Sequence, residues 1–336
     1  MSSDGMLRVA AMGDLHVMED HSASYRDLFG DISRQADVLV LTGDLTDLGK
    51  PREAELLAED LRACAIPVVA VLGNHDYESG CVEQVSAIVR QAGVHLLDGS
   101  SVEIEGVGFV GVKGFAGGFG RRMLGAFGEN AIKTFVAEAT SEAMRLENAM
   151  RAVKSRRAVV VLHYAPIPET VEGEPLEIFP FLGSSRLAET IDRFQVSAVV
   201  HGHAHRGRYE GRTPGGAPVY NVAQHIEKPN GRPYALLEVL AGQHDARRVS
   251  LSLVERPWAY LQVDPARVGA EAVQERAKGW SCRSCDGLCD REHGDHDAEQ
   301  RDAERRAFEP DTRFVRRIGG EAPELTGDRA VQSRKR

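Results

Sequence analysis

Residues 38–47 read VLVLTGDLTD, an apolar run that predicts a buried strand and is followed directly by Gly43-Asp44. Four other segments repeat this arrangement, with a metal-competent side chain at the end of a short apolar run. They are Asp14-Leu15-His16, Gly73-Asn74-His75-Asp76, His163 and Gly202-His203-Ala204-His205. Because an α/β sheet assembles its sites at the carboxyl ends of its strands, the sequence predicts one site built from five strand ends.

Each segment taken alone has a simpler explanation. Gly, Asn and Asp adopt left-handed turns at low cost, so Gly43-Asp44 and Gly73-Asn74 also fit turns that end strands. The three imidazoles of His201, His203 and His205 are harder to explain, because alternate residues of an extended segment crowd one face. Burying them without a metal or an acid would be costly. The five segments together therefore favour a metal site.

Strands and helices alternate in the first half of the chain, which is typical of βαβ units. We expect strands over 7–13, 37–42 and 67–72, and helices over 22–35, 52–64 and 81–92. Residues 102–109 predict a hairpin with a glycine-containing turn. Later strands are expected near 158–163, 197–201, 217–222, 234–239 and 248–254, with helices near 129–155 and 183–194. The sequence therefore predicts a mixed α/β fold.

The chain resembles the calcineurin-like metallophosphoesterase superfamily over residues 7 to 255. The resemblance rests on five motifs in the family's order: DLH (14–16), GDLTD (43–47), GNHD (73–76), LHYAP (162–166) and GHAH (202–205). It implies a four-layer α/β/β/α sandwich, in which two mixed sheets are flanked by helices. It also implies an enzyme that hydrolyses phosphoric esters with the help of divalent metals.

The resemblance assigns roles to individual residues. It implies that one metal is held by Asp14, His16 and His205, that a second is held by Asn74, His163 and His203, and that Asp44 bridges the two. His75 corresponds to the family's catalytic histidine, which lies beside the metals without binding them, and Asp76 is expected to orient it. His201 precedes the Gly-His-x-His motif, so we expect it to pack or to support a ligand rather than to coordinate a metal.

The expected chemistry follows from charge. Two divalent ions about 3.5 to 4 Å apart can share one hydroxide and clamp the phosphoryl oxygens for in-line displacement. Carboxylate, amide and imidazole ligands suit Mn, Fe, Zn or Ni. We therefore expect hydrolysis of a phosphoester by a metal-bridging hydroxide, with a small phosphodiester such as a cyclic nucleotide as substrate, because no large cap domain is evident. The alternatives are a phosphomonoesterase acting on small molecules or proteins, a nuclease, and a non-catalytic protein-binding scaffold with the same fold.

A glycine-dense stretch between Val110 and Gly128 carries aromatic residues together with Lys113, Arg121 and Arg122. Guanidinium groups suit phosphate oxygens and aromatic rings stack on bases, so this stretch is a candidate substrate loop. The alternative, which we favour, is a flexible connection between the hairpin and the next helix.

Composition predicts a globular protein, because 42% of the 336 residues are hydrophobic and 27% are charged. No segment has the apolar length of a bilayer span, and no basic region followed by an apolar segment and a cleavage site begins the sequence. The five cysteines do not form the paired framework of a secreted disulfide domain. We therefore expect a cytoplasmic protein that does not act at a membrane.

The last part of the chain differs from the rest. We expect a catalytic domain over 1–264 and a charged, flexible tail over 265–336. Acidic and basic residues balance in this tail, so the net charge of −9 belongs to residues 1–264 and disfavours a duplex nucleic-acid partner. A structural zinc site is one explanation of the tail's Cys282, Cys285 and Cys289, with His293 and His296 nearby, and a set of exposed thiols is the other. The oligomeric state is not predicted.

Overall fold

The first sheet of the computed structural model carries three of the five motif segments at its edge. The structure describes residues 5–20 and 24–241, all of which belong to one compact unit, Met1–Leu251. The sheet has the strand order β11-β1-β2-β3-β4. Its strands are β1 (Met6–Met12), β2 (Val38–Thr42), β3 (Val68–Val71), β4 (His95–Leu96) and β11 (Ala235–Leu240). β1 to β4 are parallel, and β11 pairs antiparallel with β1.

The second sheet is also mixed and has the order β5-β6-β7-β8-β10-β9. Its strands are β5 (Ser100–Ile104), β6 (Val107–Gly111), β7 (Ala158–Val161), β8 (Ala198–His201), β9 (Glu210–Arg212) and β10 (Pro218–Asn221). The predicted hairpin is confirmed, because β5 and β6 pair antiparallel with Val102 opposite Phe109. The central strands β6, β7, β8 and β10 are parallel, so two further motif segments follow strands that run in one direction.

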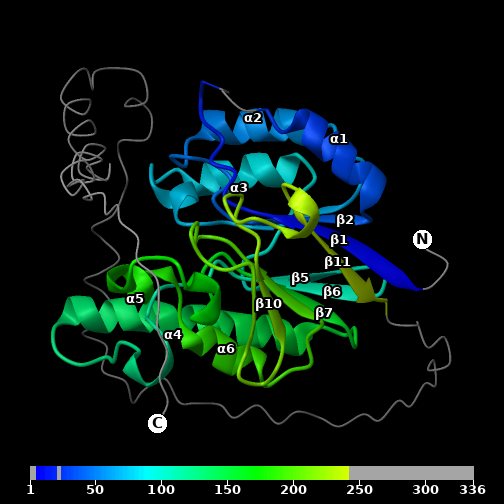
Figure 1. Cartoon of the computed structure of the whole chain (residues 1–336). Coiled ribbons are helices and arrows are strands. Elements are labelled where there is room, and N and C mark those ends of the chain that lie inside the picture. Colours follow the sequence, from blue (N-terminus) through cyan, green and yellow to red (C-terminus); the bar gives the residue numbers. More distant parts are fainter. Residues whose placement is uncertain (1–4, 21–23, 242–336) are drawn as a thin grey trace, which may run out of the picture. The chain divides into compact units, whose positions relative to one another are not determined.

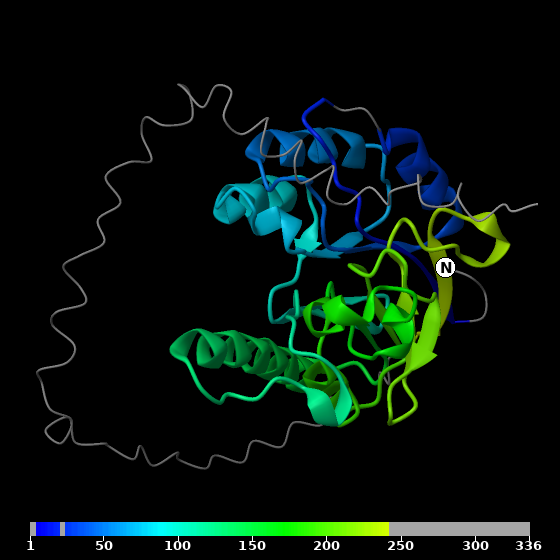
Figure 2. The ribbon, with the colours of Figure 1, turned by 60° about the vertical axis from the view of Figure 1, so that its left-hand side comes forward.

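Helices cover the outer face of each sheet, which gives four layers (Figures 1 and 2). α1 (Arg26–Gln35), α2 (Pro51–Leu61) and α3 (Val82–Gln91) lie on the first sheet, and α4 (Asn130–Ala152) and α6 (Ser185–Ile191) lie on the second. The predicted four-layer sandwich of two mixed sheets flanked by helices is confirmed.

Alternation along the strands explains the layers. In β1, Val9 and Ala11 belong to the core between the two sheets, whereas Ala10 and Met12 belong to the core under α1, α2 and α3. In β7, Val159 faces the same central core, and its neighbour Val160 packs toward α4 and α6. Strands that are buried on both faces appear in sequence as continuous apolar runs, which is the pattern that precedes each motif.

Several elements differ from the sequence-based expectation. The very short strands β4 and β9 and the helices between residues 169 and 182 were not predicted: η3 (Glu169–Val171), η4 (Leu176–Ile178) and α5 (Phe179–Leu182). The strand expected at 248–254 and the cysteine cluster of the tail lie outside the described residues. Among the described residues, no helix combines the length and the apolar character needed to cross a bilayer.

Candidate metal centre

The five motif segments follow the ends of β1, β2, β3, β7 and β8. Their side chains form three groups of metal-competent residues, in each of which the ligand atoms all lie within 4.8 Å of one another. The groups are Asp14, His16 and His205; His16, Asp44 and His75; and Asp44, His163 and His203. Because the groups share His16 and Asp44, they form one continuous site that draws on both sheets.

The backbone at this site is strained. Five non-glycine residues in the described part of the chain have positive φ, and four of them are predicted ligands: Asp14 (60°), His16 (45°), Asp44 (45°) and His203 (70°). Such conformations cost free energy for residues with a Cβ and persist where the surroundings enforce them, often at functional sites. The sharp turns let side chains from successive positions point back over the ends of the strands.

Two motif glycines allow the loops to approach closely. A Cβ on Gly73 would lie 2.1 Å from Asp44 Oδ1, and a Cβ on Gly202 would lie 2.3 Å from Asp14 Oδ2. Neither contact is sterically possible, so these positions need glycine for space rather than only for turn conformation.

The first group is centred on a buried carboxylate. Asp14 Oδ1 accepts hydrogen bonds from the backbone N–H of His203 at 2.9 Å and from His205 Nε2 at 3.0 Å. Burial alone would raise the pKa of Asp14, but the hydrogen bond from His205 and the charges of His163 and His205 outweigh it and lower the pKa to about 2. Burial lowers the pKa of His16, which favours a neutral imidazole. An ionised carboxylate beside a neutral imidazole suits a divalent metal.

A second group, formed by Asp44, His163 and His203, is built around the fully buried His163. Its Nδ1 lies 2.9 Å from the carbonyl oxygen of Thr42, and because a carbonyl only accepts, Nδ1 carries the proton. Its Nε2 faces Asn74 Oδ1 at 2.9 Å and Asp44 Oδ1 at 3.4 Å. A cation among these three atoms would accept the lone pair of a ring protonated on Nδ1 and would satisfy both oxygen atoms.

Unpartnered atoms show that the residues fit metal ions. In the described part of the chain, Asp14 Oδ2, both ring nitrogens of His16 and Thr42 Oγ1 are buried without a hydrogen-bond partner. Buried polar atoms without partners are rare in folded proteins. Burial also lowers the pKa of His203 to about 3, so that ring is neutral and has a lone pair to donate. The structure thus brings together all seven predicted ligand positions, with Asn74 joined to the second group through His163.

His75 belongs to the remaining group, with His16 and Asp44. Its Nδ1 donates a hydrogen bond of 2.6 Å to the carbonyl oxygen of Asp47, and its ring meets that of His16 edge-on with centroids 4.5 Å apart. The carbonyl fixes the tautomer, because it requires the proton on Nδ1 and leaves Nε2 free. Its backbone N–H donates to Asp44 Oδ1 at 2.9 Å, which ties the turn to the centre of the site.

Asp76 does not orient His75 directly, which corrects the sequence-based expectation. Its buried carboxylate accepts from the backbone N–H groups of Gly73 (2.8 Å), Thr46 (2.9 Å) and Leu45 (3.2 Å), and from the Thr46 hydroxyl (2.6 Å). Burial and the nearby charge of Asp44 raise the pKa of Asp76 to about 6. Asp76 therefore fastens the loop after β2 to the loop after β3, and the imidazole is held by the Asp47 carbonyl instead.

His201 has the supporting place that its position in the motif predicts. Its ring nitrogens bond to the carbonyl oxygen of Gly202 and to Thr170 Oγ1, each at 2.8 Å. Burial lowers the pKa of His201 to about 4, so the ring is neutral. Both nitrogens are occupied, which leaves none for a metal.

Sequence reasoning missed His225, an exposed residue whose ring stacks on that of His205 with centroids 4.4 Å apart. His225 lies three residues beyond the strand expected at 217–222 and belongs to none of the five motifs, so its place near a strand end was the one signal that could have marked it. Arg121 and Arg122, the candidate phosphate ligands, are exposed in the 3₁₀ helix η2 (Gly120–Arg122), and their role stays a prediction.

A model of the calcineurin-like phosphoesterase family matches residues 7–207, which contain every strand end described above. The chain belongs to the calcineurin-like phosphoesterase family. This confirms the resemblance and the class of metallophosphoesterase enzymes to which the motifs pointed.

Two curated relatives of this phosphoesterase carry phosphodiesterase names. One, from Synechococcus sp., is called "Probable cyclic nucleotide phosphodiesterase" and is 34% identical over 80 residues, which cover 21% of this chain and 31% of that protein. The other, from Arcobacter nitrofigilis, is called "Probable glycerophosphodiester phosphodiesterase" and is 23% identical over 190 residues, 55% of this chain and 63% of that protein. The phosphoesterase thus spans less than two thirds of either relative.

Among solved structures, the phosphoesterase is similar to the protein TT1561 of Thermus thermophilus, with a TM-score of 0.41 and 14% identity over 64% of this chain and 88% of that one. This similarity concerns the fold alone.

Proposed function

We propose that the chain hydrolyses small phosphodiesters at a centre of two divalent ions. The observation that carries the proposal is the place of Asp44, which shares one group of ligand atoms with His16 and another with His163 and His203. One carboxylate common to two groups is the arrangement that a bridging ligand requires. When bound, two such ions neutralise phosphoryl oxygens and lower the pKa of a shared water, which gives a hydroxide nucleophile at neutral pH.

The proposed ligand sets follow the group centred on Asp14 and the group centred on His163. Asp14, His16 and His205 would hold one ion, and Asn74, His163 and His203 would hold the other. The mixture of carboxylate, amide and imidazole donors suits Mn, Fe, Zn or Ni. His75 is the proposed catalytic residue, because the Asp47 carbonyl holds its ring through Nδ1 and leaves Nε2 for the substrate. In the imidazolium form Nε2 also carries a proton, which would stabilise the phosphoryl group or pass to the leaving oxygen.

The preference for diesters rests on the names of both relatives, each of which is called a probable phosphodiesterase. A phosphomonoesterase uses the same core and is the second candidate. A non-catalytic scaffold is disfavoured, because a scaffold has no need to keep metal-competent residues at all seven ligand positions. A cytoplasmic location and the absence of a nucleic-acid partner stay predictions.

The test compares two esters with the same chromophore. Protein reconstituted with Mn should hydrolyse bis-p-nitrophenyl phosphate with a higher kcat/KM than p-nitrophenyl phosphate, and Asp44→Ala should abolish both activities. Asp31→Ala is the matched control, since Asp31 is an exposed residue of α1 that pairs with Arg34. A higher kcat/KM on the monoester would show that the protein is a phosphomonoesterase rather than a phosphodiesterase. Equal rates in wild type and Asp44→Ala would contradict the proposed two-metal centre.

A further inference from the structure

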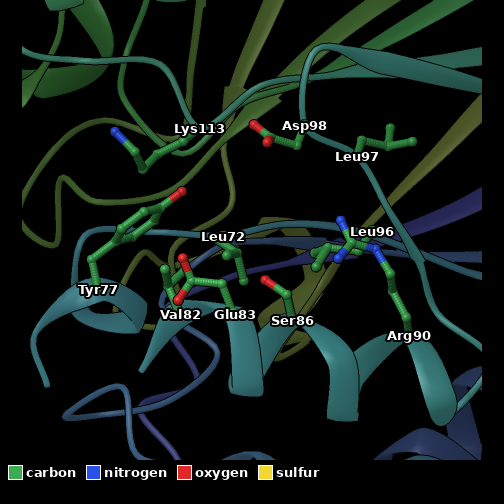
Figure 3. A pocket seen from close by; sticks show the side chains of 10 residues that line it. All are labelled: Leu72, Tyr77, Val82, Glu83, Ser86, Arg90, Leu96, Leu97, Asp98 and Lys113. Carbon is green, nitrogen blue, oxygen red and sulfur yellow. The ribbon is translucent and has the colours of Figure 1, made fainter. Parts of the chain in front are cut away.

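A cleft of about 290 Å³ lies beside the metal centre, between α3 and the turn that joins β4 to β5. Figure 3 shows Lys113 and Tyr77 at one end of the cleft and Arg90 at the other. The remaining lining residues are Leu72, Val82, Glu83, Ser86, Leu96, Leu97 and Asp98. The volume is at the lower limit of about 300 Å³ for small-molecule sites, so the cleft suits one small group rather than a polymer.

Short contacts connect this cleft to the metal centre. Tyr77 ends η1 (His75–Tyr77), the 3₁₀ turn that begins with the proposed catalytic histidine. Lys113 Nζ lies 5.3 Å from the centroid of the Tyr164 ring, and that ring lies 4.5 Å from the ring of His203. Lys113 is thus separated from a proposed metal ligand by one aromatic side chain. A phosphoester bound at the metals could extend one substituent into the cleft.

Lys113 has hydrogen-bonding capacity left for a ligand. Its Nζ donates to the carbonyl oxygen of Gly114 at 3.0 Å, which uses one of its three N–H groups. The rings of Tyr77 and Phe115 have centroids 5.5 and 5.0 Å from Nζ, and no other described residue accepts a hydrogen bond from its remaining N–H groups. Burial lowers the pKa of Lys113, and the nearby carboxylate of Glu142 partly offsets this.

The other lining groups define what the ligand must offer. Glu83 and Asp98 balance Arg90 and Lys113, so the cleft has no net charge to attract a polyanion. The leucines and Val82 supply an apolar wall. No described residue hydrogen-bonds to the Tyr77 hydroxyl. A matching group is therefore uncharged, has an apolar face and presents several oxygen or nitrogen acceptors.

We propose that this cleft is a substituent subsite of the phosphoesterase, in which Lys113 and Tyr77 select an uncharged, acceptor-rich alcohol of the nucleoside class. The inference rests on the proposed function, because the phosphoryl group must lie at the metals for its substituent to reach the cleft. Lys113 and Tyr77 are specificity-determining residues in this scheme, and the reacting atoms stay with the metal ligands and His75.

The test uses two diesters that share a leaving group. Wild-type protein with Mn should hydrolyse the p-nitrophenyl ester of thymidine 5′-monophosphate with a kcat/KM at least tenfold above that for methyl p-nitrophenyl phosphate. Lys113→Met should reduce this ratio about tenfold, because a charged hydrogen-bond donor is lost. Tyr77→Phe removes a single oxygen, so it preserves packing and should reduce the ratio about threefold. Lys154→Met is the matched control, as Lys154 is exposed on the loop before β7.

A second readout does not depend on turnover. In ligand-observed NMR, saturation transfer to thymidine should be present with metal-free wild type and Lys154→Met and reduced with Lys113→Met. A wild-type ratio near one, or a ratio that Lys113→Met leaves unchanged, overturns the subsite. No hydrolysis of either ester overturns the proposed function instead, and in that case the NMR result alone decides whether the cleft binds the nucleoside.

Discussion

At the scale of single residues, backbone carbonyls fix the two most consequential imidazoles. The Thr42 carbonyl holds His163 through Nδ1, and the Asp47 carbonyl holds His75 in the same way. Each bond sets the tautomer, so that Nε2 faces the centre of the site. The acceptors are backbone carbonyls, so these two hydrogen bonds do not use the side chains of Thr42 and Asp47.

His75→Ala should therefore separate catalysis from metal binding. We expect kcat on bis-p-nitrophenyl phosphate to fall by about 10²- to 10⁴-fold, the range for loss of a general acid or base. Metal content, measured by mass spectrometry of the reconstituted protein, should stay at the wild-type value. His95→Ala, at an exposed position of β4, is the control. A loss of metal that parallels the loss of activity would instead make His75 a ligand.

Lys228 gives a prediction about pH. Its side chain is buried and Nζ donates to the carbonyl oxygens of Ala223 and Gln224. Burial lowers the pKa of Lys228 from 10.5 to about 8. Between pH 8 and 10.5 the unfolded chain binds more protons than the folded one, so this lysine makes the free energy of unfolding rise with pH by at most about 1.4 kcal/mol per pH unit.

The measurement is urea unfolding between pH 7 and pH 10.5. Lys228→Met should lack the part of the slope that this lysine contributes, so its stability relative to wild type should fall as the pH rises above 8. Lys154→Met, which changes an exposed lysine, should follow the wild-type curve. Parallel curves for wild type and Lys228→Met would show that Lys228 keeps an ordinary pKa in the folded protein.

The site residues were predictable from sequence where a side chain carries the signal. Carboxylates and imidazoles after apolar runs marked the positions that the structure brings together, because the strand end and the chemistry coincide in sequence. Asp76 shows the limit: its hydrogen bonds go to backbone N–H groups of Gly73, Leu45 and Thr46, and backbone partners have no sequence signature. The sequence placed Lys113 in a candidate substrate loop, but the cleft at Lys113 and the stacking of His225 on His205 depend on tertiary contacts that no local pattern reveals.

At the scale of elements, prediction succeeded where burial on both faces gives a continuous apolar run. β2 and β7 are buried at every position and were found close to their observed bounds. β4 has only two residues. β9 has three residues, and none of those three is buried. Neither strand therefore has a periodic pattern to detect. The order in which the strands pair could not be predicted from the sequence, because β11 pairs with β1 although more than 200 residues of chain separate them.

The loop between β3 and η1 depends on a glycine. In Gly73→Ala, the new Cβ would lie 2.1 Å from Asp44 Oδ1 and 2.7 Å from His163 Cε1, so the loop must move away from both predicted ligands. We expect metal content and activity to be lost while the far-ultraviolet circular dichroism stays that of wild type, because no core side chain changes. Gly125→Ala, where nothing lies within 4 Å of the added Cβ, should retain both. Normal metal binding by Gly73→Ala would show that the loop relaxes without cost.

At the scale of the whole molecule, the proposed ligands come from both sheets. Asp14, Asp44 and Asn74 follow strands of the first sheet, and His163 and His203 follow strands of the second. The two sheets also share an apolar core. Metal ions bound between them would add free energy that exists only in the folded state, because the unfolded chain separates the two halves of the ligand set.

Metal loading should therefore raise the Tm of the described unit. At a free Mn concentration one hundred times Kd, a single site contributes about 2.7 kcal/mol, which corresponds to an increase in Tm of about 5 to 10 °C for a domain of this size. Mn is the chosen ion because thiolates prefer softer metals, so the cysteines of the tail should contribute little.

The measurement is differential scanning calorimetry of chelator-treated protein with and without Mn. Asp44→Ala should lose most of the shift, since it removes the carboxylate that is proposed to bridge the two ions, while Asp31→Ala should keep it. An equal shift in Asp44→Ala and wild type would place the stabilising Mn elsewhere in the chain.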